Sequence, residues 1–428
     1  MLEVLIFLVL LHSSFAQQSC PDGFQLVNGK CLLMFPNNLK HLDAEQDCSY
    51  FGGTLVTVKN SIDNRAISTF ANTTGPVSSI WLGIFCFNTE NSTITCYHDD
   101  NSGVVDYNQF APGNPTVAGN GGCVYMQVAG KSVGQWYSAP CDVIGMPFIC
   151  EVPVTGNDPD CLHNWNGFCY MGSHEMHLAT VNTTYDRAQS ICQSKSANLV
   201  SLHSKPEIDF VRAIYRDSEY QQIVIGAKAL LPGTFRWSDG SFWDYDYTDP
   251  LATSTGSCMV MDLSNRDNDG MWSQVDCQSS NYFLCKRKIG GDVGTTVETS
   301  KRKEVNPKFA GVREASKLLD FSNCNSTLIM SPGTITSYGY PNANPPKTFY
   351  TWNLAALGPY RVGIYFTDFS VYFPVNIYDA NDNLIKSPGY SQQPFEVLAP
   401  GNVVKITHDS SADAQFNYHG FTAKVLPF

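Results

Sequence analysis

The sequence predicts two copies of a disulfide-bonded α+β domain followed by an all-β sandwich. Three observations support this prediction. The cysteines recur with similar spacing in two successive segments, and each segment has two amphipathic stretches followed by short apolar and aromatic runs. After Cys324, apolar residues alternate with polar ones between turn residues, which is typical of antiparallel strands with one buried face. A length of 428 residues has room for two to four domains.

The composition excludes several classes of protein. Aromatic residues make up 12% of the chain, which is too many for a disordered acidic protein. The net charge of −12 argues against nucleic acid as a partner, because nucleic-acid-binding domains are usually basic. Fifteen cysteines without metal-site spacing favour an oxidising compartment over the cytosol.

Residues 1–16 are expected to be a signal peptide. Val4 to Leu11 is an apolar run too short to span a membrane, and Ser14 and Ala16 are small residues before the expected cleavage point. A buried N-terminal strand is the alternative. No later run of 18 apolar residues occurs, so we expect a secreted, extracellular protein without a membrane span, whose cysteines form disulfides.

The duplicated segments are residues 20–151 and 161–287. With Cys86 and Cys96 set aside, successive cysteines are 11, 17, 75, 18 and 9 residues apart in the first segment, and 8, 23, 66, 19 and 8 apart in the second. Matching order and similar steps indicate one repeated module. Each segment is expected to contain two helices, with Ser61 as a helix cap and Pro206 in a first helical turn; the helices are Leu42 to Cys48, Ser61 to Phe70, Tyr185 to Cys192 and Pro206 to Tyr215.

Residues 288–323 are expected to form a basic, flexible linker. Residues 286–317 contain nine Lys or Arg and four Asp or Glu, with little apolar periodicity. Lys301-Arg302-Lys303 could instead be a processing or polyanion-binding site, although charge runs are usually solvated. The sandwich of residues 324–428 is indicated by alternating apolar positions such as those from Val362 to Phe366.

The duplicated module resembles the C-type lectin-like domain. The first copy has Trp81-Leu82-Gly83 at the family's Trp-Ile-Gly core strand and ends in Phe148-Ile149-Cys150. The second copy has Ile225-Gly226 without the tryptophan, and Trp237-Ser-Asp-Gly240. The resemblance implies these disulfides, with Cys86–Cys96 as an additional bridge: Cys20–Cys31, Cys48–Cys150, Cys86–Cys96, Cys123–Cys141, Cys161–Cys169, Cys192–Cys285 and Cys258–Cys277.

Residues 324–428 resemble a CUB domain, which is an all-β jelly-roll sandwich. Ser331-Pro332-Gly333, Trp352, Ile377-Tyr378-Asp379 and His419-Gly420-Phe421 carry this resemblance. CUB domains usually have four cysteines, whereas this segment has only Cys324. An odd cysteine total predicts that this residue is either a free thiol or the bridge of a disulfide-linked dimer.

In C-type lectins, sugar binding usually uses calcium, whose oxygen ligands come from a Glu-Pro-Asn or Gln-Pro-Asp loop and a Trp-Asn-Asp strand. At these positions the first copy has neutral or apolar side chains, namely Asn114, Pro115, Thr116, Trp136 and Ser138. The second copy keeps one carboxylate in the set Asp249, Pro250, Leu251, Trp272 and Gln274, with Asp267 and Asp269 as weak additional metal candidates. Because calcium affinity follows ligand charge, both sets are expected to be degenerate calcium sites, with no certain cofactor.

The prolines could instead only shape a loop that offers a calcium-independent surface. Aromatic residues near it could stack on sugars or on a protein partner, although such residues more often pack internally: Phe110, Tyr137, Phe242, Trp243, Tyr245 and Tyr247. In the CUB-like segment, Asp409 matches one calcium position of that family, but the family's glutamate is replaced around Phe369-Ser370 and an aspartate is missing before Asn376. A calcium site is therefore not expected there.

Four sequons predict glycosylation on a secretory route: Asn72, Asn91, Asn182 and Asn325. An enzyme is the weakest hypothesis. His174 and His177 are three residues apart, whereas the helical zinc-protease motif needs a separation of four.

Two C-type lectin-like domains followed by a CUB domain are similar to secreted nematode lectin-like proteins, which are associated with glycan recognition and innate defence. The resemblance implies a protein that binds glycans or glycoproteins, including those of microbial surfaces. The alternative is an extracellular protein–protein adaptor without sugar affinity.

Overall fold

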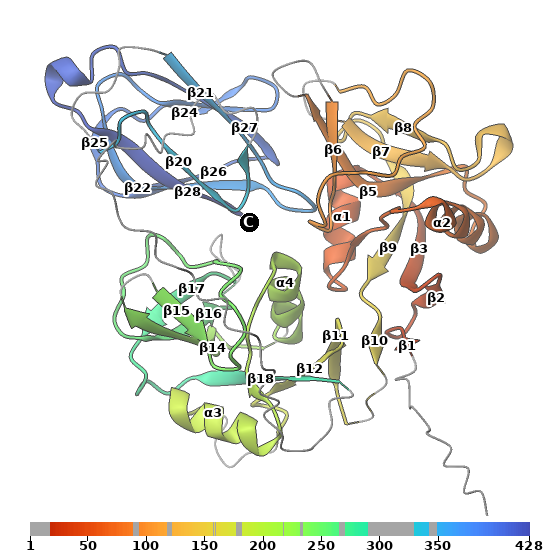
Figure 1. Cartoon of the computed structure of the whole chain (residues 1–428), viewed down its shortest axis with the longest axis horizontal. Coiled ribbons are helices and arrows are strands. Elements are labelled where there is room, and N and C mark those ends of the chain that lie inside the picture. The colour runs from red at the N-terminus through yellow and green to blue at the C-terminus, as the bar shows by residue number, and fades with distance from the viewer. Residues whose placement is uncertain are drawn as a thin grey trace, which may run out of the picture.

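The computed structural model contains three folded domains, which form the three lobes in Figure 1. It describes residues 18–88, 94–117, 122–156, 158, 160–176, 182–216, 218–231, 234–264, 270–289, 329–341 and 349–428. Several sequence-based expectations lie outside the described residues: the signal peptide at 1–16, most of the linker at 288–323, Cys324, Asn91, Asn325, Asp267, Asp269 and His177.

The first domain is a mixed sheet with two helices. Its strands lie in the order β2-β3-β9-β5-β7-β8, with β4 beside β9 and β6 beside β5, while β1 pairs with β10 in a separate ribbon. The strands are β1 Gln18–Ser19, β2 Gln25–Val27, β3 Lys30–Leu39, β4 Thr54–Leu55, β5 Ser79–Asn88, β6 Ile94–His98, β7 Gly122–Gln127, β8 Trp136–Ala139, β9 Met146–Val152 and β10 Thr155–Gly156. The helices are α1 His41–Ser49, α2 Ser61–Thr74 and the 3-10 turn Gly130–Ser132.

The second domain repeats this arrangement. Its strands lie in the order β11-β12-β18-β14-β16-β17, with β13 beside β18 and β15 beside β14, which matches the first domain position for position. The elements are β11 His163–Trp165, β12 Phe168–Gly172, α3 Tyr185–Ser194, β13 Asn198–Leu199, α4 Lys205–Ile214, β14 Gln222–Leu231, β15 Thr234–Trp237, β16 Cys258–Asp262, β17 Trp272–Val275 and β18 Tyr282–Lys288. The repeat seen in the cysteine spacing is therefore also a repeat of the fold.

All four predicted helices form, but one predicted cap is wrong. Asn60, and not Ser61, caps α2, because its side-chain oxygen accepts hydrogen bonds from the backbone amides of Ile62 and Asp63. Asn60 lies one residue before the helix, where a short polar side chain can reach these otherwise unpaired amides. In α4, Pro206 lies in the first turn as predicted.

The third domain is the predicted all-β sandwich. One sheet has the order β19-β21-β27-β23-β24, and the other has β20-β28-β22-β25 with β26 beside β22. Their apolar side chains share one core, which includes Trp352 and Ile406 from the first sheet and Phe366 and Phe421 from the second. The strands are β19 Ile329–Met330, β20 Gly333–Thr336, β21 Phe349–Ala355, β22 Val362–Val371, β23 Asn376–Asp379, β24 Leu384–Lys386, β25 Tyr390–Gln392, β26 Phe395–Leu398, β27 Val403–Asp409 and β28 Gly420–Pro427, with a 3-10 turn at Ala414–Phe416.

Seven disulfides join strands and helices in the two α+β domains. Their pairings are those that the resemblance implied: Cys20–Cys31, Cys48–Cys150, Cys86–Cys96, Cys123–Cys141, Cys161–Cys169, Cys192–Cys285 and Cys258–Cys277. No helix in the described part of the chain is both long enough and apolar enough to cross a bilayer.

Direct contacts join every pair of domains. The indole of Trp165 in the second domain donates to the Gly52 carbonyl of the first at 2.6 Å. The Tyr247 hydroxyl donates to the Pro427 carbonyl of the third domain at 2.7 Å, and the Gly358 amide donates to Asp99 of the first at 3.3 Å. Sequence alone left the packing of the two α+β domains open, and the structure shows that they pack against each other and against the sandwich.

Candidate functional site

The first domain brings its predicted site residues together at one end of the sheet. The Asn114 side-chain oxygen accepts hydrogen bonds from both the backbone amide and the hydroxyl of Ser138, each at 3.1 Å. The Thr116 amide donates to the Ser138 hydroxyl at 2.7 Å, and the two hydroxyl oxygens lie 3.1 Å apart. Asn114 and Ser138 are half-buried and Thr116 is exposed, so this neutral polar cluster is open to solvent. Pro115 sits between them after a cis peptide bond.

A buried tryptophan fixes the strand that carries Ser138. The Trp136 ring is fully buried, and its Nε1–H donates to Asn64 of α2 at 2.8 Å. The Trp136 backbone bonds to Gln109 and Ala111, which anchors the preceding segment of the loop. Because side chains alternate along a strand, Ser138 lies on the same face of β8 as Trp136. Sequence reasoning missed the role of Asn64, since nothing in its spacing links it to the loop.

The second domain places its loop at the equivalent position but does not join its predicted residues. The backbones of Thr248 and Trp272 form an isolated parallel β-bridge, as those of Phe110 and Trp136 do in the first domain. However, Asp249 accepts a hydrogen bond at 2.8 Å from the Leu251 amide within its own turn. Within the described residues, no hydrogen bond connects Asp249 to the Gln274 side chain, and the Asp249–Pro250 bond is not cis. Among the described residues, the two copies therefore share a fold but not this cluster of hydrogen bonds.

Neither set of described donors fits a calcium ion. In the first domain the oxygens of Asn114, Thr116 and Ser138 are neutral and are hydrogen-bonded to one another. In the second domain Asp249 is the only predicted carboxylate among the described residues, and Leu251 supplies no side-chain oxygen. Calcium needs six to eight oxygen ligands, and its affinity rises with their charge. The side-chain oxygens at these positions instead take part in hydrogen bonds.

Most of the aromatic candidates are half-buried and pack against other rings of their domains. Tyr247 is fully buried, Trp243 stacks on Trp237 with ring centres 4.9 Å apart, and burial raises the pKa of Tyr245. In the first domain, Phe110 meets the edge of Trp136 and Tyr137 stacks on Tyr125 at 5.5 Å. Phe242 is the exception, because 81% of it is exposed. Most of these aromatic side chains therefore contribute to packing, and each of the half-buried ones keeps part of its surface exposed.

In the third domain, Asp409, the residue that matches one calcium position of the CUB family, lies in a turn. One Asp409 oxygen accepts from the Ser411 amide at 2.9 Å. Asp413, which sequence reasoning did not single out, is buried, accepts from the Tyr372 amide at 2.7 Å and lies 2.8 Å from His408 Nε2. These carboxylates hold loops at one end of the sandwich.

The described residues do not support the zinc-protease hypothesis. His174 lies in a turn after β12, and not on a helix that could present two histidines on one face. Its neighbour Glu175 lies 2.6 Å from His163 Nε2, which ties the turn to β11.

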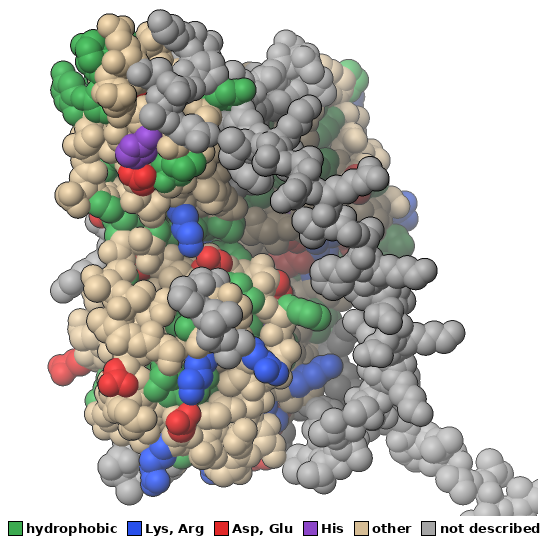
Figure 2. Space-filling model, turned by 60° about the vertical axis from the view of Figure 1, so that its left-hand side comes forward, with side chains coloured by type: hydrophobic (Ala, Val, Ile, Leu, Met, Phe, Trp, Pro, Cys, Tyr) green, Lys and Arg blue, Asp and Glu red, His purple; other side chains and the backbone are tan. Residues whose placement is uncertain are grey.

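Two predicted glycosylation sites lie on the surface. Asn72, near the end of α2, and Asn182, just before α3, are both exposed. Figure 2 shows that charged side chains are scattered singly over the visible face of the second and third domains, with apolar side chains between them. This agrees with a chain in which only 15% of residues are charged.

The sequence and fold were compared with known proteins. The family model described as "Lectin C-type domain" matches residues 38–152 and 181–287. The chain is 36% identical over 273 residues to "C-type lectin domain-containing protein 38" of Caenorhabditis elegans. This alignment covers 63% of this chain and 68% of that protein. It is 26% identical over 204 residues to human "Lymphocyte antigen 75", covering 43% of this chain and 11% of that protein. Among solved structures, human lithostathine aligns with 31% of this chain and 91% of its own at 24% identity, with a TM-score of 0.27.

Proposed function

Because the chain belongs to the family of proteins with lectin C-type domains, we propose that it is a secreted carbohydrate-binding protein that works without calcium. The cluster of Asn114, Thr116 and Ser138 carries this proposal. It combines hydroxyl and amide groups at a half-exposed position held by a buried tryptophan. Such groups can exchange hydrogen bonds with sugar hydroxyls, since each can donate or accept.

Other features support the remaining parts of the proposal. Seven disulfides suit an oxidising, extracellular location. The two five-stranded sheets of residues 329–428 are compatible with a CUB-type domain. The nematode relative, whose name gives a C-type lectin domain, supports the lectin part of the proposal, and a role in defence that faces microbial glycans is proposed from the sequence resemblance.

A glycan array probed with the full chain, with and without a calcium chelator, tests this function. We expect binding that the chelator does not change. Binding that disappears with chelator would refute calcium independence. No signal on any glycan would favour the alternative, an extracellular protein–protein adaptor.

Two matched variants locate the site. Asn114→Ala removes the acceptor that holds Ser138 and should weaken glycan binding about tenfold, the effect of losing one or two hydrogen bonds. Gln274→Ala changes a similar polar side chain in the second domain, where no comparable cluster forms among the described residues, and should leave binding unchanged. Equal losses in both variants would show that the first-domain cluster is not the site.

A further inference from the structure

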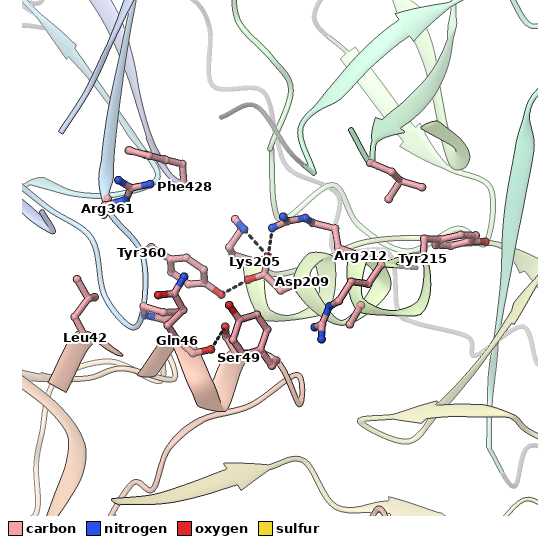
Figure 3. A pocket seen from close by; sticks show the side chains of 15 residues that line it. Leu42, Gln46, Ser49, Lys205, Asp209, Arg212, Tyr215, Tyr360, Arg361 and Phe428 are labelled. Atoms are coloured by element: carbon pink, nitrogen blue, oxygen red, sulfur yellow. Dashed lines mark hydrogen bonds and ion pairs between the residues drawn. The ribbon is translucent and has the colours of Figure 1, made fainter. Parts of the chain in front are cut away.

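A pocket of about 710 Å3 lies where the three domains meet. Its walls come from α1 of the first domain, α4 of the second and the segment 359–361 of the third, as Figure 3 shows. This volume lies in the range of pockets that bind small ligands. The pocket shares no lining residue with the Asn114, Thr116 and Ser138 cluster of the first domain. Binding at one place can therefore be tested independently of binding at the other.

The pocket is basic in an acidic chain. Its described lining side chains include four cations, Lys205, Arg212, Arg216 and Arg361, and one anion, Asp209, which gives a net side-chain charge of +3. The whole chain has a net charge of −12. A concentration of positive charge against the overall sign raises the local concentration of anions at that place.

Asp209 organises the pocket's inner wall. One of its oxygens lies 2.6 Å from Lys205 Nζ and 3.1 Å from Arg212 Nη1. The other accepts a hydrogen bond from the Tyr360 hydroxyl of the third domain at 2.7 Å. Figure 3 shows these three side chains converging on the carboxylate. A single carboxylate carries one negative charge against the two positive charges of Lys205 and Arg212. Its hydrogen bond with Tyr360 also joins the third domain to α4.

The other two cations stand at the pocket's edge. Arg216 lies over the ring of Tyr50 at 4.8 Å, and Arg361 lies over the ring of Phe428 at 4.4 Å. Both arginines are exposed, and no carboxylate of the described residues forms an ion pair with either guanidinium. Stacking uses the flat face of a guanidinium, so the N–H groups along its edge remain directed outward for a bidentate anion.

The lining favours a saccharide over a peptide. Arginine pairs with carboxylate and sulfate-like groups through two parallel hydrogen bonds, and tyrosine rings offer an apolar face with a polar tip. Of the three tyrosines in the lining, Tyr50 is 52% exposed and can offer its ring to a sugar. Tyr215 and Tyr360 are buried, and their hydroxyls already donate hydrogen bonds within the protein. The described lining residues lie on helices and loops and include four cations. The backbones of Arg361 and Phe428 are hydrogen-bonded to each other, so the lining offers neither a free strand edge nor the apolar groove that peptides usually use.

We propose that this junction pocket binds a short anionic oligosaccharide carrying sulfate or carboxylate groups. Such a ligand would contact all three domains at once. Since a ligand that binds only the assembled arrangement stabilises it, binding should raise the melting temperature of the full chain.

The experiment measures binding of a heparin-derived hexasaccharide to the full chain by calorimetry at low and at physiological salt. The parent should bind, and more weakly as salt rises. Arg216→Ala with Arg361→Ala should lower the affinity at least about tenfold, because charge-assisted contacts are lost. The matched double variant Arg65→Ala with Arg236→Ala removes two exposed arginines outside the pocket lining and should keep the parent affinity. Arg216→Lys with Arg361→Lys keeps the charges and should bind with intermediate affinity.

Several outcomes would overturn the proposal. Equal losses in the two alanine double variants would show non-specific attraction. Equally tight binding of inorganic sulfate would reduce the pocket to a simple anion site, and tighter binding of an acidic peptide would make it a peptide site. Asn114→Ala should leave hexasaccharide binding intact, which separates this pocket from the first-domain cluster; a parallel loss would place the anionic sugar at that cluster instead.

Discussion

The buried ion pair between Lys286 and Glu207 should be a main support of α4. The two side chains are only 6% and 4% exposed, and Lys286 Nζ lies 2.5 Å from Glu207 Oε1. The same carboxylate accepts from the Tyr170 hydroxyl at 2.7 Å and from the His203 amide at 2.8 Å. Glu207 is in the first turn of α4, and Lys286 is on β18. The pair therefore ties the helix of the junction pocket to the sheet of its own domain.

The expected effect of Lys286→Met follows from this burial. Methionine fills the space of the lysine stem but leaves the Glu207 carboxylate without its cation, which costs about 3–5 kcal/mol for a buried pair. Adding Glu207→Gln removes the unpaired charge while keeping an oxygen for the Tyr170 hydroxyl. The double variant should therefore be more stable than the Lys286→Met single variant by about 2 kcal/mol, the difference between an unpaired buried charge and an imperfect neutral hydrogen bond.

Denaturant unfolding followed by tryptophan fluorescence measures this, because four of the seven tryptophans belong to the second domain. The disulfides are kept intact, and midpoints are compared with circular dichroism to identify the transition of that domain. Two results would refute the reasoning: a double variant as unstable as Lys286→Met, or a Lys286→Met variant within about 1 kcal/mol of the parent. Either would mean that leaving the buried Glu207 carboxylate unpaired does not destabilise the domain.

Two further predictions concern other buried contacts. Burial, with the nearby Asp99 charge adding to it, raises the pKa of Glu45, so the folded chain keeps a proton that the unfolded chain loses as pH rises above about 4.5. Stability should fall over that range by up to about 1.4 kcal/mol per pH unit, and Glu45→Gln should flatten this slope in melting curves between pH 5 and 8; an unchanged slope would contradict it. Gly52→Ala should speed protease cleavage between the first two domains, because a Cβ there lies 2.7 Å from Trp165 Nε1. Gly23→Ala has a similar positive φ but open space around it and serves as the control; equal cleavage rates would contradict the role of Gly52.

The sequence predicted the fold well where the information is local or repeated. The cysteine steps and the helical patterns recur in both halves, and the two sheets have the same strand order. Alternating apolar residues predicted the sandwich, because a strand with one buried face has a period of two. The cap of α2 was misplaced by one residue, since Asn60 and Ser61 are both good capping types and only backbone geometry separates them.

The candidate sites were harder to predict. The positions of Asn114, Thr116 and Ser138 could be found by motif, but their mutual hydrogen bonds depend on how the loop folds against β8. The junction pocket could not be found at all, because its residues come from three domains and from segments that lie far apart in the sequence. Its one sequence signal is the spacing of Lys205, Asp209 and Arg212, which places opposite charges on one helical face.

The duplicated fold explains how two copies could acquire different tasks. Each copy is held by its own disulfides and sheet, and its second helix also contacts other parts of the molecule. In the first copy this helix supplies Asn64, which anchors the tryptophan beside the neutral loop cluster. In the second copy the equivalent helix supplies Asp209, which binds the third domain through Tyr360. The two helices therefore hold the same place in the repeated fold but contact different partners, strand β8 of its own domain in the first copy and the third domain in the second.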